Sequence, residues 1–188
     1  MVKKYSHYFD NKIELFLTQA KDCWSKDAKS RQVEILEYIQ YKKNRLIMPT
    51  QLHSDKVLTI SDESDNIECD AIVYNGRLSL VGAINVADCI PICMYDHNSG
   101  YIALIHSGWK GTLKKIAIKT INKMLDLGAD KDSITVFIGP SIRGCCYEVE
   151  DFFASKFHTS CIIKREGSFY VDLTSQILKD LEHESSSW

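Results

Sequence analysis

The chain has 188 residues, of which 45% are hydrophobic, 26% charged and 10% aromatic. This composition excludes a disordered or low-complexity chain and supplies enough apolar material for one core, so we expect a single domain over residues 1–188. The 23 Lys and Arg residues nearly balance the 25 Asp and Glu residues, giving a net charge of −2. The chain has no excess of basic residues, so we do not expect nucleic acid as a partner.

The sequence shows neither a membrane span nor a secretion signal. Its apolar runs fall short of the roughly 20 residues that cross a bilayer, and no apolar stretch follows the basic residues Lys3 and Lys4. We therefore expect a cytoplasmic protein with no membrane partner. Thiols stay reduced in that compartment, so each of the seven cysteines is expected to be a packing residue unless a site uses it.

The spacing of apolar residues predicts strands through the middle of the chain and helices around them. Strands are expected at 13–18, 46–48, 56–60, 78–86, 90–95, 101–105, 133–138, 162–164 and 169–171. Helices are expected from Asp27 to about residue 44, over 110–127, over 149–158 and from Asp172 onward. Residues 96–100 have the composition of a hairpin turn. The pattern predicts an α/β fold of the α+β type, with mixed β-sheets in a layered core flanked by helices.

Side chains able to bind a metal occur beside the predicted strand ends. His53, Cys89 and His106 stand in the segments QLHS, ADCIP and HSGWKG. Imidazole and thiolate are zinc ligands, and three of them leave the fourth position open, as in catalytic zinc sites. Such a metal lowers the pKa of bound water toward about 7. The same residues also permit a metal-free alternative, in which Cys89 is a nucleophile paired with His106 and oriented by Asp88.

A third segment, IGPSIRGCCYEV at residues 138–149, has the composition of a shaped loop. Its Arg143 is available to bind an anion such as phosphate, although a surface arginine on an ordinary connection is the alternative. The adjacent Cys145 and Cys146 suit neither one metal nor an unstrained mutual disulfide. We expect both to be packing residues.

Four motifs in order, QLHSDKV, ADCIPICMYD, IHSGWKGTL and IGPSIRGCCYEV, closely resemble the YfiH-type family, which has been labelled the multicopper polyphenol oxidase or laccase domain family. The resemblance runs from about Thr18 to Leu173. It implies zinc as cofactor, bound at the positions that match His53, Cys89 and His106, which would also be the catalytic residues.

The resemblance further implies purine nucleoside chemistry. The expected reactions are phosphorolysis of adenosine, inosine, guanosine or methylthioadenosine with phosphate, and deamination of adenosine. Arg143 and Asp88 would contact the substrates. A multicopper laccase is not expected, because it needs many histidines, whereas this chain has six and no HxH pair.

Two features depart from the family pattern. Gln19 stands where members usually carry an arginine before a Gly-rich loop, and the chain reaches Trp188 without a further strand bearing paired arginines. We expect the zinc site to be kept and substrate affinity and specificity to differ. A non-catalytic binding module that retains zinc is therefore an alternative function, beside the metal-free Cys–His hydrolase.

Overall fold

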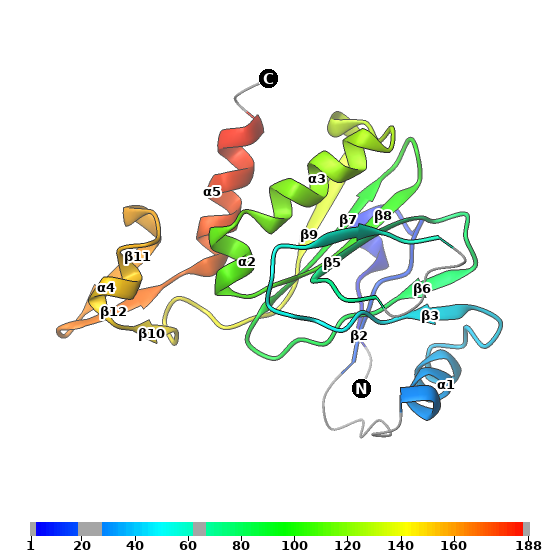
Figure 1. The fold of residues 1–188 in the computed structure, drawn as a ribbon, viewed down its shortest axis with the longest axis horizontal. Coiled ribbons are helices and arrows are strands. Elements are labelled where there is room, and N and C mark those ends of the chain that lie inside the picture. Colours follow the sequence, from blue (N-terminus) through cyan, green and yellow to red (C-terminus); the bar gives the residue numbers. More distant parts are fainter. Residues whose placement is uncertain (1–2, 19–27, 62–66, 186–188) are drawn as a thin grey trace.

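A five-stranded sheet lies at the centre of the computed structural model, which describes residues 3–18, 28–61 and 67–185 (Figure 1). Its strand order is β4-β5-β8-β7-β9. The strands are β4 (Val57–Thr59), β5 (Ala71–Asn75), β7 (Ile90–Asp96), β8 (Tyr101–Ser107) and β9 (Ile134–Ile138). Strand β4 runs parallel to β5, and the other neighbours are antiparallel.

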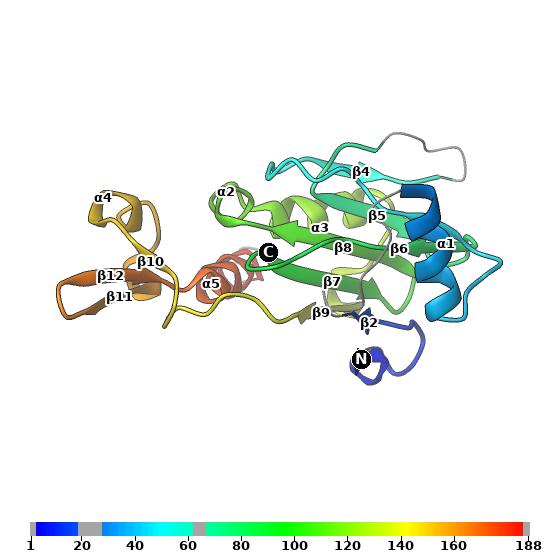
Figure 2. The ribbon, with the colours of Figure 1, turned by 90° about the horizontal axis from the view of Figure 1, so that it is seen from below.

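Three smaller sheets surround this centre. They are β10 (Glu148–Val149), β12 (Ser168–Val171) and β11 (Ile162–Arg165), then β3 (Arg45–Ile47) parallel to β6 (Leu80–Gly82), then β1 (Lys3–Lys4) antiparallel to β2 (Phe16–Leu17). The sheet of β10, β12 and β11 projects from the rest along the longest axis, together with α4 (Figure 2). The expected class, mixed sheets with flanking helices, is confirmed.

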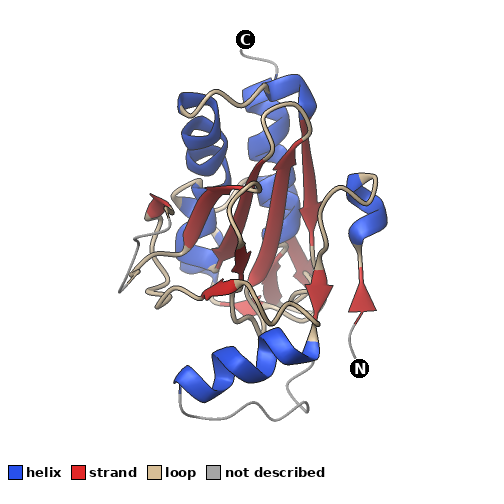
Figure 3. Ribbon diagram, turned by 90° about the vertical axis from the view of Figure 1, so that its right-hand side faces the viewer, coloured by secondary structure: helices blue, strands red, loops and turns tan. Residues whose placement is uncertain are grey.

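Helices α2 (Trp109–Leu113), α3 (Ile116–Asp126) and α5 (Leu173–Ser185) lie on one face of the central sheet (Figure 3). Helix α1 (Ala28–Tyr38) lies across one end of the sheet, and α4 (Asp151–Ala154) accompanies the projecting sheet (Figure 2 and Figure 3). There are 3-10 turns at Ser6–Phe9, Lys131–Ser133 and Thr159–Cys161. Helix α3 packs against β8 and β5, and α5 packs against α3. No helix among the described residues is long and apolar enough to span a bilayer.

The central sheet separates two buried apolar clusters. Side chains alternate between the faces of a strand, so Ile105 joins the cluster under α3 whereas Leu104 joins the cluster on the other side. The α3 side also contains Met94 and Met124, and the opposite side contains Phe9 from the N-terminal segment. His106 follows the alternation onto the face of Leu104, away from α3.

The hairpin predicted around residues 96–100 is confirmed, because β7 and β8 pair across that turn. The single helix predicted over 110–127 is wrong. The chain forms two helices, since Lys115 between them adopts a left-handed conformation with φ of 57°. The helix predicted over 149–158 shortens to α4, because Glu148 and Val149 pair with β12 instead.

Other boundaries also differ. Helix α1 ends at Tyr38 rather than near residue 44, and its expected cap Asp27 lies outside the described residues. The strands expected at 13–18 and 78–86 contract to β2 and β6. Strand β5, which lies inside the sheet between β4 and β8, was not predicted.

Candidate metal centre

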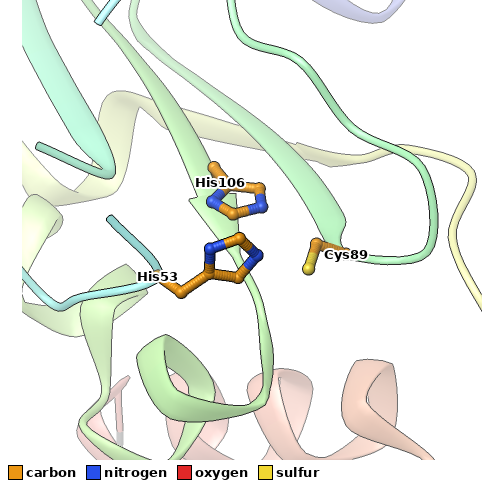
Figure 4. Close-up of side chains that lie close together, drawn as sticks. All are labelled: His53, Cys89 and His106. Atoms are coloured by element: carbon orange, nitrogen blue, oxygen red, sulfur yellow. The ribbon is translucent and has the colours of Figure 1, made fainter. Parts of the chain in front are cut away.

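The three side chains singled out as metal ligands come together in space (Figure 4). The ligand atoms of His53, Cys89 and His106 all lie within 4.8 Å of one another. The two imidazole rings stand nearly perpendicular, with centroids 4.7 Å apart and an interplanar angle of 85°. His106 is buried, Cys89 is half-buried and His53 is exposed, so the cluster opens to solvent beside His53.

The register of the central sheet explains why residues distant in sequence meet here. Pro91 in β7 lies opposite His106 in β8. Cys89, directly before β7, therefore lies beside the last residues of β8. Gly108 follows β8, and a Cβ atom there would lie 3.0 Å from Cys89 Sγ and 3.3 Å from His53 Cδ2. The missing side chain at this glycine therefore keeps room for the cluster.

A buried aspartate that was not predicted holds the two histidines. Asp70 is 0% exposed, and its Oδ1 accepts hydrogen bonds from His106 Nδ1 at 2.8 Å and from the His53 backbone N–H at 2.9 Å. Its Oδ2 accepts from the N–H of Leu52 at 3.2 Å, and from the N–H and Oγ of Ser54 at 2.7 and 2.6 Å. The Asp70 carboxylate thus orients both His106 at the end of β8 and the turn of residues 52–54 that carries His53.

These hydrogen bonds fix the ionisation of Asp70 and the orientation of its partners. Burial alone would raise the pKa of Asp70, but the hydrogen bonds from Ser54, His106 and backbone N–H groups outweigh it and lower the pKa. The carboxylate accepts a hydrogen bond from the protonated Nδ1 of His106, which leaves the lone pair of Nε2 free for a metal. His53 has a φ of 54°, a strained value for a residue other than glycine, and its N–H bond to Asp70 holds it there.

The environment of Cys89 favours a role as metal ligand over a role as metal-free nucleophile. Burial raises the pKa of this thiol, and the negative charges of Asp88 and Asp70 raise it further. A thiolate nucleophile needs the opposite, a lowered pKa beside cationic groups. A bound metal cation would supply that positive charge and stabilise the thiolate.

The donor set fits a zinc ion. Zinc takes nitrogen and sulfur ligands at about 2.0–2.3 Å in a tetrahedron, so its ligand atoms lie roughly 3.4–3.8 Å apart. The ligand atoms of His53, Cys89 and His106 all lie within 4.8 Å of one another, so the remaining gap of about 1 Å is one that side-chain rotation would close. Within the described part of the chain, no other group of three His, Cys, Asp or Glu side chains could hold a metal ion.

The two expected substrate contacts lie on the surface near this cluster. Arg143 and Asp88 are both exposed. The loop of Arg143 is tied to the segment of Cys89, because the Ile142 N–H donates to the Asp88 carbonyl at 3.0 Å. Gln19, at the position where the family usually has an arginine, lies outside the described residues.

Of the remaining cysteines, some pack as expected and two do not. Cys69, Cys93 and Cys161 are buried. The expectation that Cys145 and Cys146 are packing residues is wrong, because both are exposed. Their turn carries them outward instead of into either apolar cluster.

Comparison with known proteins places the chain in a family. The model of the family described as multi-copper polyphenol oxidoreductase laccase matches residues 20–185, so the chain belongs to this family. The fold agrees with the crystal structure of the YfiH protein of Bacillus licheniformis, with a TM-score of 0.73 and 23% identity over 82% of this chain and 64% of that one.

Relatives with functional names are also similar. A purine nucleoside phosphorylase from Clostridium acetobutylicum is 39% identical over 131 residues, covering 69% of this chain and 51% of the relative. One from Aquifex aeolicus is 32% identical over 74% of this chain and 65% of its own length. An adenosine deaminase from an unknown prokaryotic organism is 33% identical over 68% of this chain and 55% of its own length. The chain thus spans about half to two thirds of these relatives.

Proposed function

We propose that this protein is a zinc-dependent enzyme acting on purine nucleosides. Its reactions are phosphorolysis of adenosine, inosine, guanosine or methylthioadenosine, and deamination of adenosine. The observation that carries the proposal is the convergence of His53, Cys89 and His106 on one solvent-accessible space. The names of the relatives, purine nucleoside phosphorylase and adenosine deaminase, support the substrate class.

In this proposal the chain's own residues have separate tasks. His53, Cys89 and His106 hold the zinc, which when bound supplies a Lewis acid and activates water. Asp70 keeps the proton of His106 on Nδ1 through its 2.8 Å hydrogen bond and so directs Nε2 toward the cluster. His53, the exposed member, lies on the side from which a nucleoside enters.

Phosphorolysis also needs an anion site, because phosphate must attack the anomeric carbon of the ribose while the purine leaves as free base. We assign this task to Arg143, whose guanidinium suits bidentate contact with phosphate oxygens. Asp88 is assigned to contact the nucleoside. Both side chains are exposed, and the backbone bond between Ile142 and Asp88 keeps their segments adjacent.

The direct test uses the purified full chain loaded with zinc and supplied with inosine or adenosine and phosphate. We expect free purine base and ribose 1-phosphate, no base without phosphate, and loss of turnover on chelation with recovery on adding zinc. Arg143→Ala should raise the KM for phosphate and leave zinc content unchanged, whereas His106→Ala should lose zinc. One equivalent of bound zinc with neither base nor inosine formed from adenosine would contradict the enzymatic proposal and favour a binding module.

Alkylation of Cys89 separates the zinc enzyme from a metal-free hydrolase. Zinc-bound thiolate reacts slowly with iodoacetamide, so Cys89 should be protected in the loaded protein and become reactive after chelation. Because the pKa of the free thiol is raised, the alkylation that follows chelation should speed up toward alkaline pH, where the chelated and zinc-loaded proteins are best compared. Rapid alkylation of Cys89 at neutral pH, insensitive to chelator, would instead favour the hydrolase.

A further inference from the structure

Two thiols outside the metal cluster lie in contact on the protein surface. Cys145 Sγ and Cys146 Sγ are 3.3 Å apart, and both residues are exposed. The other described cysteines differ, since Cys69, Cys93 and Cys161 are buried and Cys89 belongs to the metal cluster. Neither the proposed reaction nor either apolar cluster uses the exposed pair.

The turn that carries the pair is firmly held. The N–H groups of Cys146 and Tyr147 both donate to the Arg143 carbonyl, at 2.8 and 3.1 Å. A Cβ atom at Gly144 would lie 2.8 Å from the Cβ of Asp172, so the turn is packed closely against the start of α5. The backbone therefore keeps the two sulfurs in contact, 3.3 Å apart, before any bond forms between them.

The contact between the sulfurs suits a stepwise reaction of the pair. Either thiol can donate to the other across the 3.3 Å separation. The hydrogen bond with Cys145 raises the pKa of Cys146, the charge of Cys145 raises it further, and the nearby cation of Arg165 acts in the opposite direction. Whichever thiol is oxidised first, the other lies close enough to attack it as the resolving sulfur.

We propose that Cys145 and Cys146 are a reversible oxidation site for hydrogen peroxide and related hydroperoxides. The thiolate of one cysteine attacks the peroxide, the O–O bond breaks with loss of hydroxide, and that sulfur becomes a sulfenic acid. The thiolate of the other cysteine then attacks this sulfur, the S–O bond breaks with loss of a second hydroxide, and the S–S bond forms. The two thiol protons convert the hydroxides into water. In sum, two thiols and one hydrogen peroxide give one disulfide and two waters.

The geometry of adjacent residues makes this disulfide easy to reduce. Consecutive Cα atoms are about 3.8 Å apart across a trans peptide, which is closer than the 4.4–6.8 Å usual for disulfides. A disulfide formed there is strained, and strained, exposed disulfides have more oxidising potentials than structural ones. Glutathione should therefore reverse the oxidation.

The test maps thiols after mild oxidation of the reduced, zinc-loaded full chain. After peroxide treatment, denaturation and alkylation, mass spectrometry should show the peptide with Cys145 and Cys146 lighter by two hydrogens and unalkylated. Peptides with the buried Cys69 and Cys93 should be alkylated as internal controls. Glutathione should restore alkylation at both exposed positions. A pair that stays alkylatable after peroxide, or that appears bonded to another peptide or a second chain, would overturn the proposal.

Matched variants distinguish a disulfide between Cys145 and Cys146 from independent oxidation of either thiol. With Cys146→Ser, Cys145 should stop at sulfenic acid, which dimedone traps, and the protection reversed by glutathione should be lost. Cys161→Ser, at a buried cysteine, should leave the oxidation of the pair unchanged in folded protein, as checked by circular dichroism. Equal protection of Cys145 in Cys146→Ser and wild-type protein would contradict a bond between the two neighbours. Because both sulfurs are exposed, serine at either position is compatible with the fold.

Discussion

Replacing Asp70 with asparagine changes one oxygen of the carboxylate into an amide donor. If the amide takes the place of Oδ2, the N–H groups of Leu52 and Ser54 lose their acceptor. If it takes the place of Oδ1, the His53 N–H loses its acceptor and His106 Nδ1 must accept a hydrogen bond. In the second case the proton of His106 moves to Nε2, and that nitrogen can no longer bind a metal.

The expected magnitude follows from these contacts. A hydrogen bond to a charged group contributes about 1.5–3 kcal/mol, and either orientation of the amide disturbs two such bonds. We expect Asp70→Asn to lower the free energy of unfolding by roughly 3 kcal/mol or more. Loss of a partner that orients a ligand typically weakens metal affinity about 10–100-fold, and we expect zinc affinity to fall within that range.

The assay combines competition against a chromophoric zinc chelator with denaturant unfolding of the zinc-free protein. Asp55→Asn is the matched control, because Asp55 lies near the same turn but pairs with Lys114 and Lys119 at the surface. Exposed ion pairs contribute about 0–1 kcal/mol, so this control should keep zinc affinity and most of the stability. A folded Asp70→Asn protein that binds zinc as tightly as wild type would refute the assigned role of Asp70.

Three further predictions concern packing and pH. Gly108→Ala would place a methyl group 3.0 Å from Cys89 Sγ and 3.3 Å from His53 Cδ2, so zinc affinity measured by chelator competition should fall roughly tenfold; unchanged affinity would show that the cluster yields. Zinc uptake should release protons and weaken as pH falls, because zinc binds the thiolate of Cys89, whose pKa burial raises; a pH indicator in weak buffer would report it. Burial alone would raise the pKa of Asp96, but hydroxyl and backbone donors hold it at about 2, below its usual 3.8. Because the folded-state pKa of Asp96 is lowered, its ionised carboxylate stabilises the fold above about pH 4, and this contribution is lost as pH falls through 2. Asp96→Asn should therefore cost about 2 kcal/mol in neutral-pH unfolding and progressively less in acid; a constant cost would contradict this account.

The sequence predicted the parts of the fold that depend on local patterns. The hairpin of β7 and β8 follows from two apolar runs separated by Asp96–Gly100, a turn-forming segment. The break between α2 and α3 was missed, because the apolar spacing continues across it and Lys115, which takes the left-handed conformation, is not a residue that signals a helix end.

The candidate site was found only in part, for a related reason. Ligand chemistry and the family motifs singled out His53, Cys89 and His106, but neither reveals which acid faces them. Asp70 is brought to His106 by the pairing of β5 with β8, a contact between residues 36 apart in the sequence. An aspartate directly before the apolar run Ala71–Tyr74 was the available signal. It becomes informative once that run is recognised as a strand beside β8.

The hydrogen bonds of Asp70 have a consequence for how a metal ion would bind at the proposed site. The turn of His53 and the ring of His106 are held by a carboxylate that belongs to the folded chain, not by the ion itself. The entropy of ordering two ligands is therefore lost when the chain folds, before any ion arrives. Small zinc domains, in contrast, fold only as they bind. If the proposed zinc site is correct, the folded chain is a preorganised receptor, and it would gain or lose the ion without unfolding, according to the free zinc around it.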